Sequence, residues 1–217
     1  MPDDILKETE TRHGNSKVTR NDWLRAARDR LVTKGVGDVK ILTLSGELGV
    51  ARSSFYWYFS DRADLLAALL AEWEARNTRC IVEKCGQPAV TVGEAVCNFF
   101  ECFIDDTLFD QGLDFAVREW SRRDRHVRDL IEAADHQRLE AVTAMFGRYG
   151  FDAAEADARA RILYFMQLGY HALDVREAMD IRMSRIEAYL KGFTGEEATV
   201  EVVAAFREKA FGLDGKG

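Results

Sequence analysis

The sequence has 217 residues, 47% of them hydrophobic, and a formal net charge of −7. This length is enough to bury a full core, in one large domain or two small ones. No apolar run reaches the roughly 18 residues that cross a bilayer, which excludes a membrane-spanning helix. Residues 1–15 are polar and acidic and lack the apolar core of a signal peptide, so we expect a cytoplasmic protein.

The cysteines and histidines do not indicate a metal, redox or cofactor site. Four cysteines occur, at positions 80, 85, 97 and 102, without a C-x-x-C pair and without a zinc-ligand spacing. In a reducing compartment we expect them to be small buried or half-buried side chains. The four histidines are scattered; His126, His136 and His171 could meet in space, but the sequence does not place the carboxylate or thiolate partners that a metal site needs. We therefore predict neither a metal nor a cofactor.

The apolar residues recur with helical spacing and only two prolines interrupt the chain, which favours an all-α fold. Residues 1–15 are expected to form a disordered arm. The first helix is predicted from Thr19 to about Lys34 and is ended by glycines at 35 and 37. Arg20 lies near its start, where an anion can contact both the side chain and the helix N-terminus.

A tight turn separates the next two predicted helices, at 41–48 and 51–59. Gly49 lies in this turn, because glycine tolerates the left-handed backbone that ends a helix abruptly. Asp61 is expected to cap a long helix, running to about Glu83, that links this region to the rest of the chain. Two short helices on a tight turn are the layout that places one helix in the major groove of DNA.

The third predicted helix has two different faces. Ala51, Phe55 and Phe59 share one face and should pack inward. The other face carries Arg52, Ser53, Tyr56 and Trp57. An aromatic core cluster explains Phe55 and Phe59, but a helix this short cannot bury its whole circumference. A cation, a hydroxyl and two aromatic rings on the outer face suit phosphates, base edges and thymine methyls.

The charge distribution is compatible with such a surface. Residues 16–66 contain nine Lys and Arg against six Asp and Glu, a net charge of +3, so the remainder carries −10. A basic head on an acidic body can bind phosphate locally, while the body limits indiscriminate association.

Over about residues 18–70 the chain resembles the TetR family of bacterial transcription regulators. The resemblance rests on Gly49-Val50, on the block Ser53-Ser54-Phe55-Tyr56-Trp57-Tyr58-Phe59, and on Asp61-Arg62-Ala63-Asp64-Leu65-Leu66. Two positions depart from the family pattern, with serine at 53 where glycine is common and tyrosine at 58 where histidine is common. The tyrosine hydroxyl retains a donor for a phosphate, but a pH-sensitive contact there is in doubt.

The resemblance implies a three-helix helix-turn-helix DNA-binding domain at 16–66 and an effector-binding and dimerisation domain, a helical bundle, at 67–217. It implies a repressor that binds a palindromic operator in double-stranded DNA as a homodimer and is released by a small molecule. The predicted DNA contacts are Arg20, Thr43, Arg52, Ser53, Ser54, Tyr56, Trp57, Tyr58 and Arg62.

The body is predicted to contain further helices at about 91–108, 111–123, 124–149, 152–175, 183–191 and 196–211. The helices at 152–175 and 196–211 are apolar over a wide arc, as expected of a four-helix dimer interface. Aromatic residues with a few polar neighbours also suggest an effector pocket, for which an ordinary aromatic core is the alternative. The predicted pocket residues are Phe99, Phe103, Phe115, Arg118, Trp120, Tyr164 and Gln167.

The sequence also bears on two other classes of function. A helical enzyme is disfavoured because the sequence contains no nucleophile elbow, Gly-rich phosphate loop or metal-ligand pair, so no catalytic residue is predicted. The acidic pair Glu101 and Asp105 is interpreted as a solvated edge. A helical module that binds protein rather than DNA remains open, and a steep salt dependence of DNA binding would distinguish the two.

Overall fold

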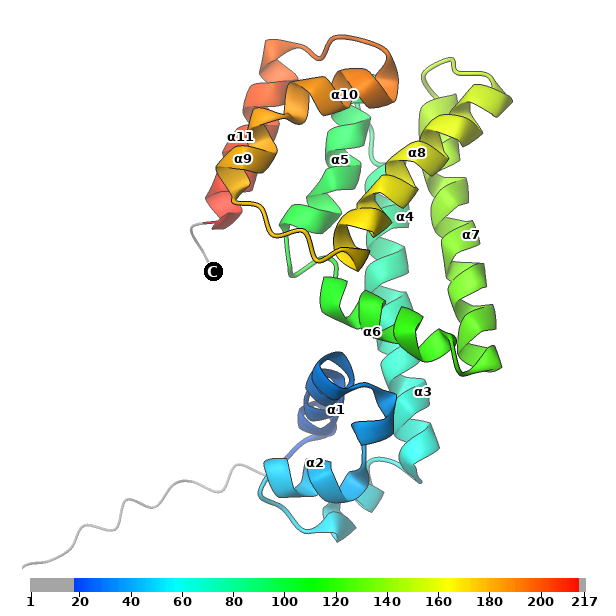
Figure 1. The fold of residues 1–217 in the computed structure, drawn as a ribbon, viewed down its shortest axis with the longest axis vertical. Helices are drawn as coiled ribbons and strands as arrows, with labels where there is room; N and C mark the ends of the chain where they lie inside the picture. Colours follow the sequence, from blue (N-terminus) through cyan, green and yellow to red (C-terminus); the bar gives the residue numbers. More distant parts are fainter. Residues whose placement is uncertain (1–17, 215–217) are drawn as a thin grey trace, which may run out of the picture.

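The computed structural model describes residues 18–214, and within this range the protein contains helices and no strand. Figure 1 shows a small N-terminal group of helices and a larger helical bundle, joined by one long helix. The all-α prediction is therefore confirmed. The predicted disordered arm, 1–15, lies outside the described residues.

The N-terminal group, here called the head, begins at the capping residue of its first helix. Its elements are α1 (Arg20–Lys34), η1 (Val36–Asp38), α2 (Ile41–Glu47) and η2 (Arg52–Trp57), where η1 and η2 are 3₁₀ helices. Thr19 and Asp22 form a capping box at α1, in which each side chain accepts a hydrogen bond from the backbone N–H of the other. The predicted first helix therefore starts where its capping signal lies.

The long connecting helix consists of α3 (Arg62–Trp73), a π-helical turn η3 (Glu74–Thr78) and α4 (Arg79–Gly86). Asp61 caps α3 by accepting the backbone N–H of Asp64 at 2.9 Å, as predicted. The helix runs slightly beyond its predicted end and leads from the head into the body (Figure 1).

The body, residues 79–214, contains α4 and seven further helices. These are α5 (Val92–Ile104), α6 (Gln111–Ser121), α7 (Arg125–Gly147), α8 (Ala153–Ala172), α9 (Met179–Ser184), α10 (Ile186–Thr194) and α11 (Val200–Asp214). Thr91, Asp110, Asp124 and Asp152 cap four of them through side-chain oxygens. The single helix predicted at 183–191 is instead the pair α9 and α10, and the last helix begins later than predicted.

Two hydrophobic cores hold these helices together. One lies in the body between α4, α5, α8, α10 and α11 and the C-terminal half of α7. The other joins the head to α3, α6 and the first half of α7, through residues such as Leu65, Leu113, Val117 and Val127. Arg28 of α1 also forms an ion pair of 2.5 Å with Asp110 at the start of α6, which joins the head to α6. The head therefore packs directly against the body as well as through the connecting helix.

Candidate nucleic-acid interface and candidate ligand cavity

The turn between α2 and η2 is a Schellman motif. The backbone N–H of Val50 donates to the carbonyl of Ser45 at 3.0 Å, and that of Gly49 donates to Gly46 at 3.2 Å. Gly49 has φ +65°, and a Cβ there would meet no atom within 4 Å. The left-handed backbone, rather than lack of space, therefore selects glycine, as the sequence predicted.

The segment after the turn is the short 3₁₀ helix η2 rather than the α-helix predicted at 51–59. Phe55 and Phe59 are buried and stack on each other at a centroid distance of 5.4 Å, while Trp23 of α1 meets Phe55 edge-on at 5.2 Å. The inward face is therefore confirmed for these two phenylalanines. The predicted inward orientation is wrong for Ala51, which is exposed because it precedes η2 in extended backbone.

The outer side of η2 carries Arg52, Ser53, Tyr56 and Trp57, all exposed. Tyr56 is 54% exposed and Trp57 is 69% exposed, although both are large aromatic side chains. The Tyr56 ring packs edge-on against the buried Phe55 at a centroid distance of 5.3 Å, so it is anchored although it is largely exposed. The predicted outward orientation of this surface is confirmed, and its chemistry suits stacking, hydrogen bonding and phosphate contact.

Three further predicted contact residues lie elsewhere in the head. Arg20 is exposed at the first position of α1, with its guanidinium 4.9 Å from the ring centre of Phe59. Thr43 is half-buried in the first turn of α2. Ser54 is also half-buried, and its hydroxyl donates to the carbonyl of Ala51 at 2.8 Å. Their contact with DNA remains a prediction.

Two predicted contacts are corrected by their hydrogen bonds. The hydroxyl of Tyr58 donates to the carbonyl of Val18 at 2.8 Å, so its proton is not available to a phosphate. The Arg62 guanidinium donates to the carbonyls of Val39 and Val36, at 2.6 and 2.5 Å. Arg62 is therefore a positioning residue that fastens the segment before α2 to the start of α3.

The residues predicted to form a ligand pocket do not come together in one place. Phe99 and Phe103 are buried in the body core. Trp120 is nearly buried and borders a surface groove beside the end of α1. Phe115 lines this groove too, and with Gln167 it lines a second cleft. These aromatic side chains are mostly core residues, which is the alternative that the sequence left open.

The other two predicted pocket residues, Arg118 and Tyr164, belong to a buried ionic network. Arg118 pairs with Asp114 at 2.8 Å and with Asp135 at 2.6 Å, while the fully buried Arg138 pairs with Asp114 at 3.0 Å. The Tyr164 hydroxyl donates to Asp135 at 2.6 Å. Burial alone would raise the pKa of Asp114, but the two guanidinium groups lower it to about 2. The charged and polar groups of these side chains are paired with one another within the network.

Glu101 is also corrected, since it is buried rather than part of a solvated edge. Its carboxylate pairs with Lys84 of α4 and with Lys209 of α11, each at 2.5 Å. It therefore joins three helices of the body. All four cysteines are buried as predicted, and the Sγ atoms of Cys80 and Cys102 lie 2.6 Å apart.

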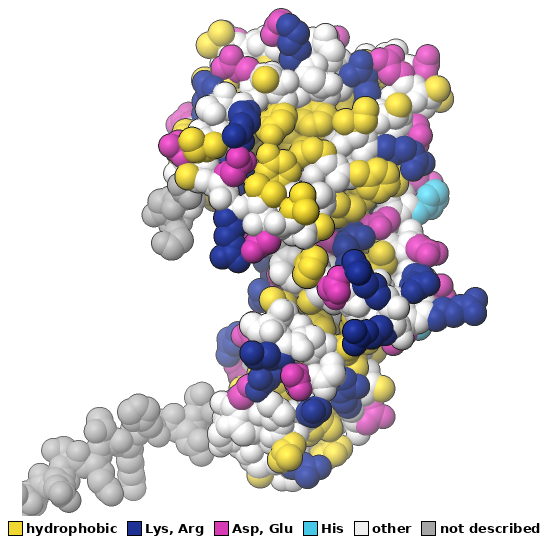
Figure 2. Space-filling model, viewed as in Figure 1, with side chains coloured by type: hydrophobic (Ala, Val, Ile, Leu, Met, Phe, Trp, Pro, Cys, Tyr) yellow, Lys and Arg dark blue, Asp and Glu magenta, His cyan; other side chains and the backbone are white. Residues whose placement is uncertain are grey.

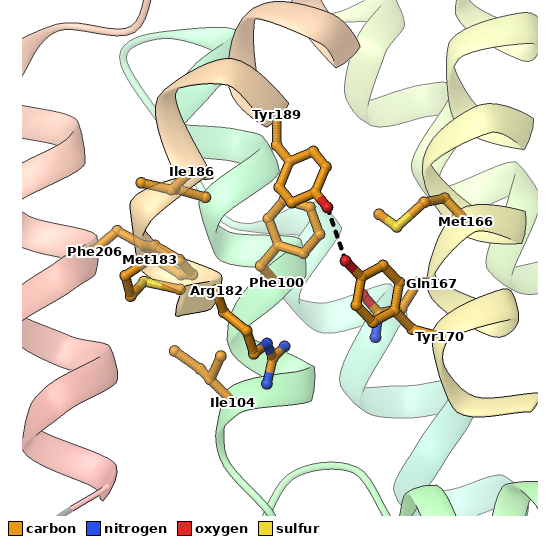
Figure 3. Close-up of a pocket in the computed structure, with 10 residues that line it drawn as sticks. All are labelled: Phe100, Ile104, Met166, Gln167, Tyr170, Arg182, Met183, Ile186, Tyr189 and Phe206. Carbon is orange, nitrogen blue, oxygen red and sulfur yellow. Dashed lines mark hydrogen bonds between the residues drawn. The ribbon is translucent and has the colours of Figure 1, made fainter. Parts of the chain in front are cut away.

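An apolar cavity lies between α5, α8, α9, α10 and α11. Its lining residues are Phe100, Ile104, Met166, Gln167, Tyr170, Arg182, Met183, Ile186, Tyr189 and Phe206 (Figure 3). The hydroxyls of Tyr170 and Tyr189 meet across it at 2.8 Å. Figure 2 shows hydrophobic side chains gathered on this face of the body. Gln167 is the one residue of this set that is among the predicted pocket residues, because no local motif marks residues that meet from five helices.

The cavity itself is small, about 40 Å³, but it adjoins a cleft of about 420 Å³. The cleft is lined from α1, α6, α8 and the segment leading into α9, and it shares Gln167, Tyr170 and Arg182 with the cavity. Together they have the size of a small-molecule site, typically about 300–1,000 Å³.

The sequence of the head matches a known protein family. Residues 24–69 match the sequence model of the bacterial regulatory proteins of the tetR family. No curated protein sequence matches the chain. Among the described residues, none of the helices combines the length and the apolar character needed to cross a membrane.

Solved structures match over most of the chain. AmtR of Mycobacterium smegmatis is 18% identical, with a TM-score of 0.59 over 92% of this chain and 96% of that one. A protein from Mesorhizobium loti described as a TetR-family transcriptional regulator is 12% identical, with a TM-score of 0.56 over 86% and 94%. GusR of Salmonella enterica is 16% identical, with a TM-score of 0.52 over 91% and 98%. The head therefore belongs to the TetR family of bacterial regulatory proteins, and the chain as a whole has the fold of that family's transcriptional regulators.

Proposed function

We propose that this protein is a repressor that binds a palindromic DNA operator as a homodimer and is released by a small-molecule effector. The observation that carries the proposal is the outer side of η2, where Arg52, Tyr56 and Trp57 are exposed within the segment that matches the TetR family. Arg20, Thr43, Ser53 and Ser54 are the further proposed DNA contacts. Their side chains offer donors to phosphates, and the aromatic rings offer apolar surface to bases.

The proposed homodimer is supported by apolar side chains left exposed on two body helices. Ile162 and Phe165 of α8 are 60% and 48% exposed, Leu173 directly after α8 is 78% exposed, and Val200 and Phe211 of α11 are 80% and 46% exposed. α9 and α10 lie between these two helices (Figure 1), so the interface would include their surface too. Two-fold symmetry of the dimer would place two heads on successive major grooves of a palindromic site.

Effector release is supported by the packing between head and body. The cleft that adjoins the cavity reaches Val32 at the end of α1, so it borders both parts of the molecule. A ligand there that favours one arrangement of α1 and α6 over another would shift the spacing of two heads in a dimer. DNA affinity would fall because only one spacing fits the operator.

Selection of bound sequences from a pool of random DNA duplexes tests the DNA-binding proposal. The expected result is one enriched sequence with inverted half-sites, bound with an affinity that falls steeply as salt is added, because phosphate contacts release counterions. Absence of enrichment, or binding that is insensitive to salt, would contradict the proposal and favour a head that binds protein.

A further inference from the structure

Arg182 of α9 is a half-buried cation at the boundary between the apolar cavity and the cleft. Its guanidinium points into the cavity, toward the space between Ile104 and Gln167 (Figure 3). Among residues 18–214 its side chain has neither an ion pair nor a hydrogen-bond partner. A half-buried guanidinium beside an apolar wall, without a partner of its own, is suited to bind a negatively charged group.

The neighbouring acids cannot supply that group. Asp174, which also lines the cleft, pairs with Arg176 at 2.7 Å. Glu177 pairs with Arg185 at 2.5 Å and accepts a weak hydrogen bond from Tyr170. Each of these carboxylates is therefore matched by another arginine. Arg182 is left as a surplus positive charge at the site.

His171 adds a second unused donor to the cleft. Its Nε2 lies 2.8 Å from Nε2 of Gln167, and because that amide nitrogen only donates, the histidine Nε2 accepts and its proton lies on Nδ1. Nδ1 is buried and has no hydrogen-bond partner. Burial lowers the pKa of His171 to about 4, so at neutral pH the ring is an uncharged donor.

The opposite end of the cavity is apolar. Phe100 of α5, Met166 of α8, Ile186 of α10 and Phe206 of α11 line it. Such walls suit an aromatic or aliphatic skeleton, and they would not solvate a second charge. The site therefore has one cationic end and one apolar end.

We propose that this cavity and cleft bind an anionic amphipathic small molecule, a carboxylate on an aromatic or aliphatic skeleton, with the carboxylate on Arg182 and the skeleton against the apolar wall. The inference deepens the proposed function, because this molecule would be the effector. Arginine presents parallel N–H donors that match the two oxygens of a carboxylate. A neutral amide of the same skeleton would leave the arginine charge unpaired.

The test is calorimetric titration of the full-length protein, without DNA, with octanoate, 3-phenylpropanoate and indole-3-acetate, each paired with its primary amide. We expect at least one acid to bind roughly tenfold or more tightly than its amide, as a charged hydrogen-bonded pair requires. Arg182→Gln should remove that preference by weakening the acid and not the amide. Arg182→Lys should retain part of it, since the charge remains without the planar donor pair.

Arg125→Gln is the matched control, because Arg125 is an exposed arginine of α7 that lines neither the cavity nor the cleft. It should bind acids and amides as the unchanged protein does. Equal affinity for acids and amides, unaltered acid binding by a folded Arg182→Gln variant, or no binding of any of the three acids would overturn the proposal. Because DNA is absent from the titration, failure here is distinct from failure of the operator selection.

Discussion

Trp57 and Tyr56 are the side chains on which proposed DNA binding depends most. We expect Trp57→Ala or Tyr56→Ala to abolish operator binding in a gel-shift assay, because each removes a large ring from an exposed surface and not from the core. Folding should be unchanged, as the thermal unfolding midpoint can verify. Val90→Ala is the control, since Val90 is 90% exposed in the body. Unchanged operator affinity in the Trp57 variant would count against the DNA surface assigned to η2.

Arg62 should act through the stability of the head and not through phosphate contact. Loss of its two hydrogen bonds in Arg62→Ala is expected to lower the free energy of unfolding by about 1.5–3 kcal/mol, measured by urea denaturation. The salt dependence of operator binding should keep its slope. A slope reduced by about one unit, with stability unchanged, would instead identify a phosphate contact.

At the residue scale, positions governed by backbone conformation or by a local cap could be predicted from sequence. Gly49 and Asp61 belong to this class, because their partners lie within a few residues. Tyr58 and Arg62 could not, because their acceptors lie 40, 26 and 23 residues away along the chain. A polar side chain that suits a phosphate suits a backbone carbonyl equally well, and only tertiary packing decides between them.

At the scale of elements, the π turn η3 is where the connecting helix is bound to α6. Asn77 is fully buried, and its amide both donates to the carbonyl of Asp110 and accepts from its N–H, each at 2.9 Å. Asn77→Leu should cost about 2–4 kcal/mol in urea unfolding, because two buried backbone groups lose their partners. Asn21→Leu, on the exposed side of α1, is the control. A cost below about 0.5 kcal/mol for Asn77→Leu would show that water replaces the amide.

The ionic network beneath α6 predicts a loss of stability in acid. Because Asp114 has a folded-state pKa of about 2, below the roughly 3.9 of an unfolded aspartate, its contribution is present above about pH 4 and is lost as the pH falls toward 2. The loss should be about 2 kcal/mol in urea unfolding, and Asp114→Asn should lack this component. The carboxyl carbon of Asp114 should titrate near pH 2 by NMR. Titration near pH 4, or equal acid sensitivity in both proteins, would contradict the assignment.

The positions of the helices could largely be predicted from helical spacing and capping residues, whereas the residues that line the cavity could not be predicted. The sequence marks where α5, α7 and α8 begin because Thr91, Asp124 and Asp152 cap them locally. The cavity forms where five helices meet, so its lining depends on which face each helix buries. Aromatic richness in α5 suggested pocket residues at Phe99 and Phe103, but both are buried in the core.

At the scale of the whole molecule, net charge and exposed apolar surface have separate roles. The excess positive charge of residues 16–66 should promote phosphate binding, while residues 67–217, with a net charge of −8, should repel DNA from the body. The apolar surface near α8 does not belong to the DNA interface, since it lies on the body (Figure 2). Contiguous exposed apolar surface of this kind is typical of a protein–protein interface.

Ile162 of α8 provides the sharpest test of the proposed homodimer. Ile162→Arg places a charge where a second copy would bury an apolar side chain, at a position that is 60% exposed in one copy. We expect sedimentation to show a monomer and operator affinity to fall, because one head alone contacts only half of a palindrome. Ala133→Arg makes the same change in charge at an exposed position of α7, outside both proposed interface helices, and should remain dimeric. An Ile162→Arg protein that sediments as a dimer would exclude this part of α8 from the interface, and the operator would then have to be read by a differently arranged pair of heads.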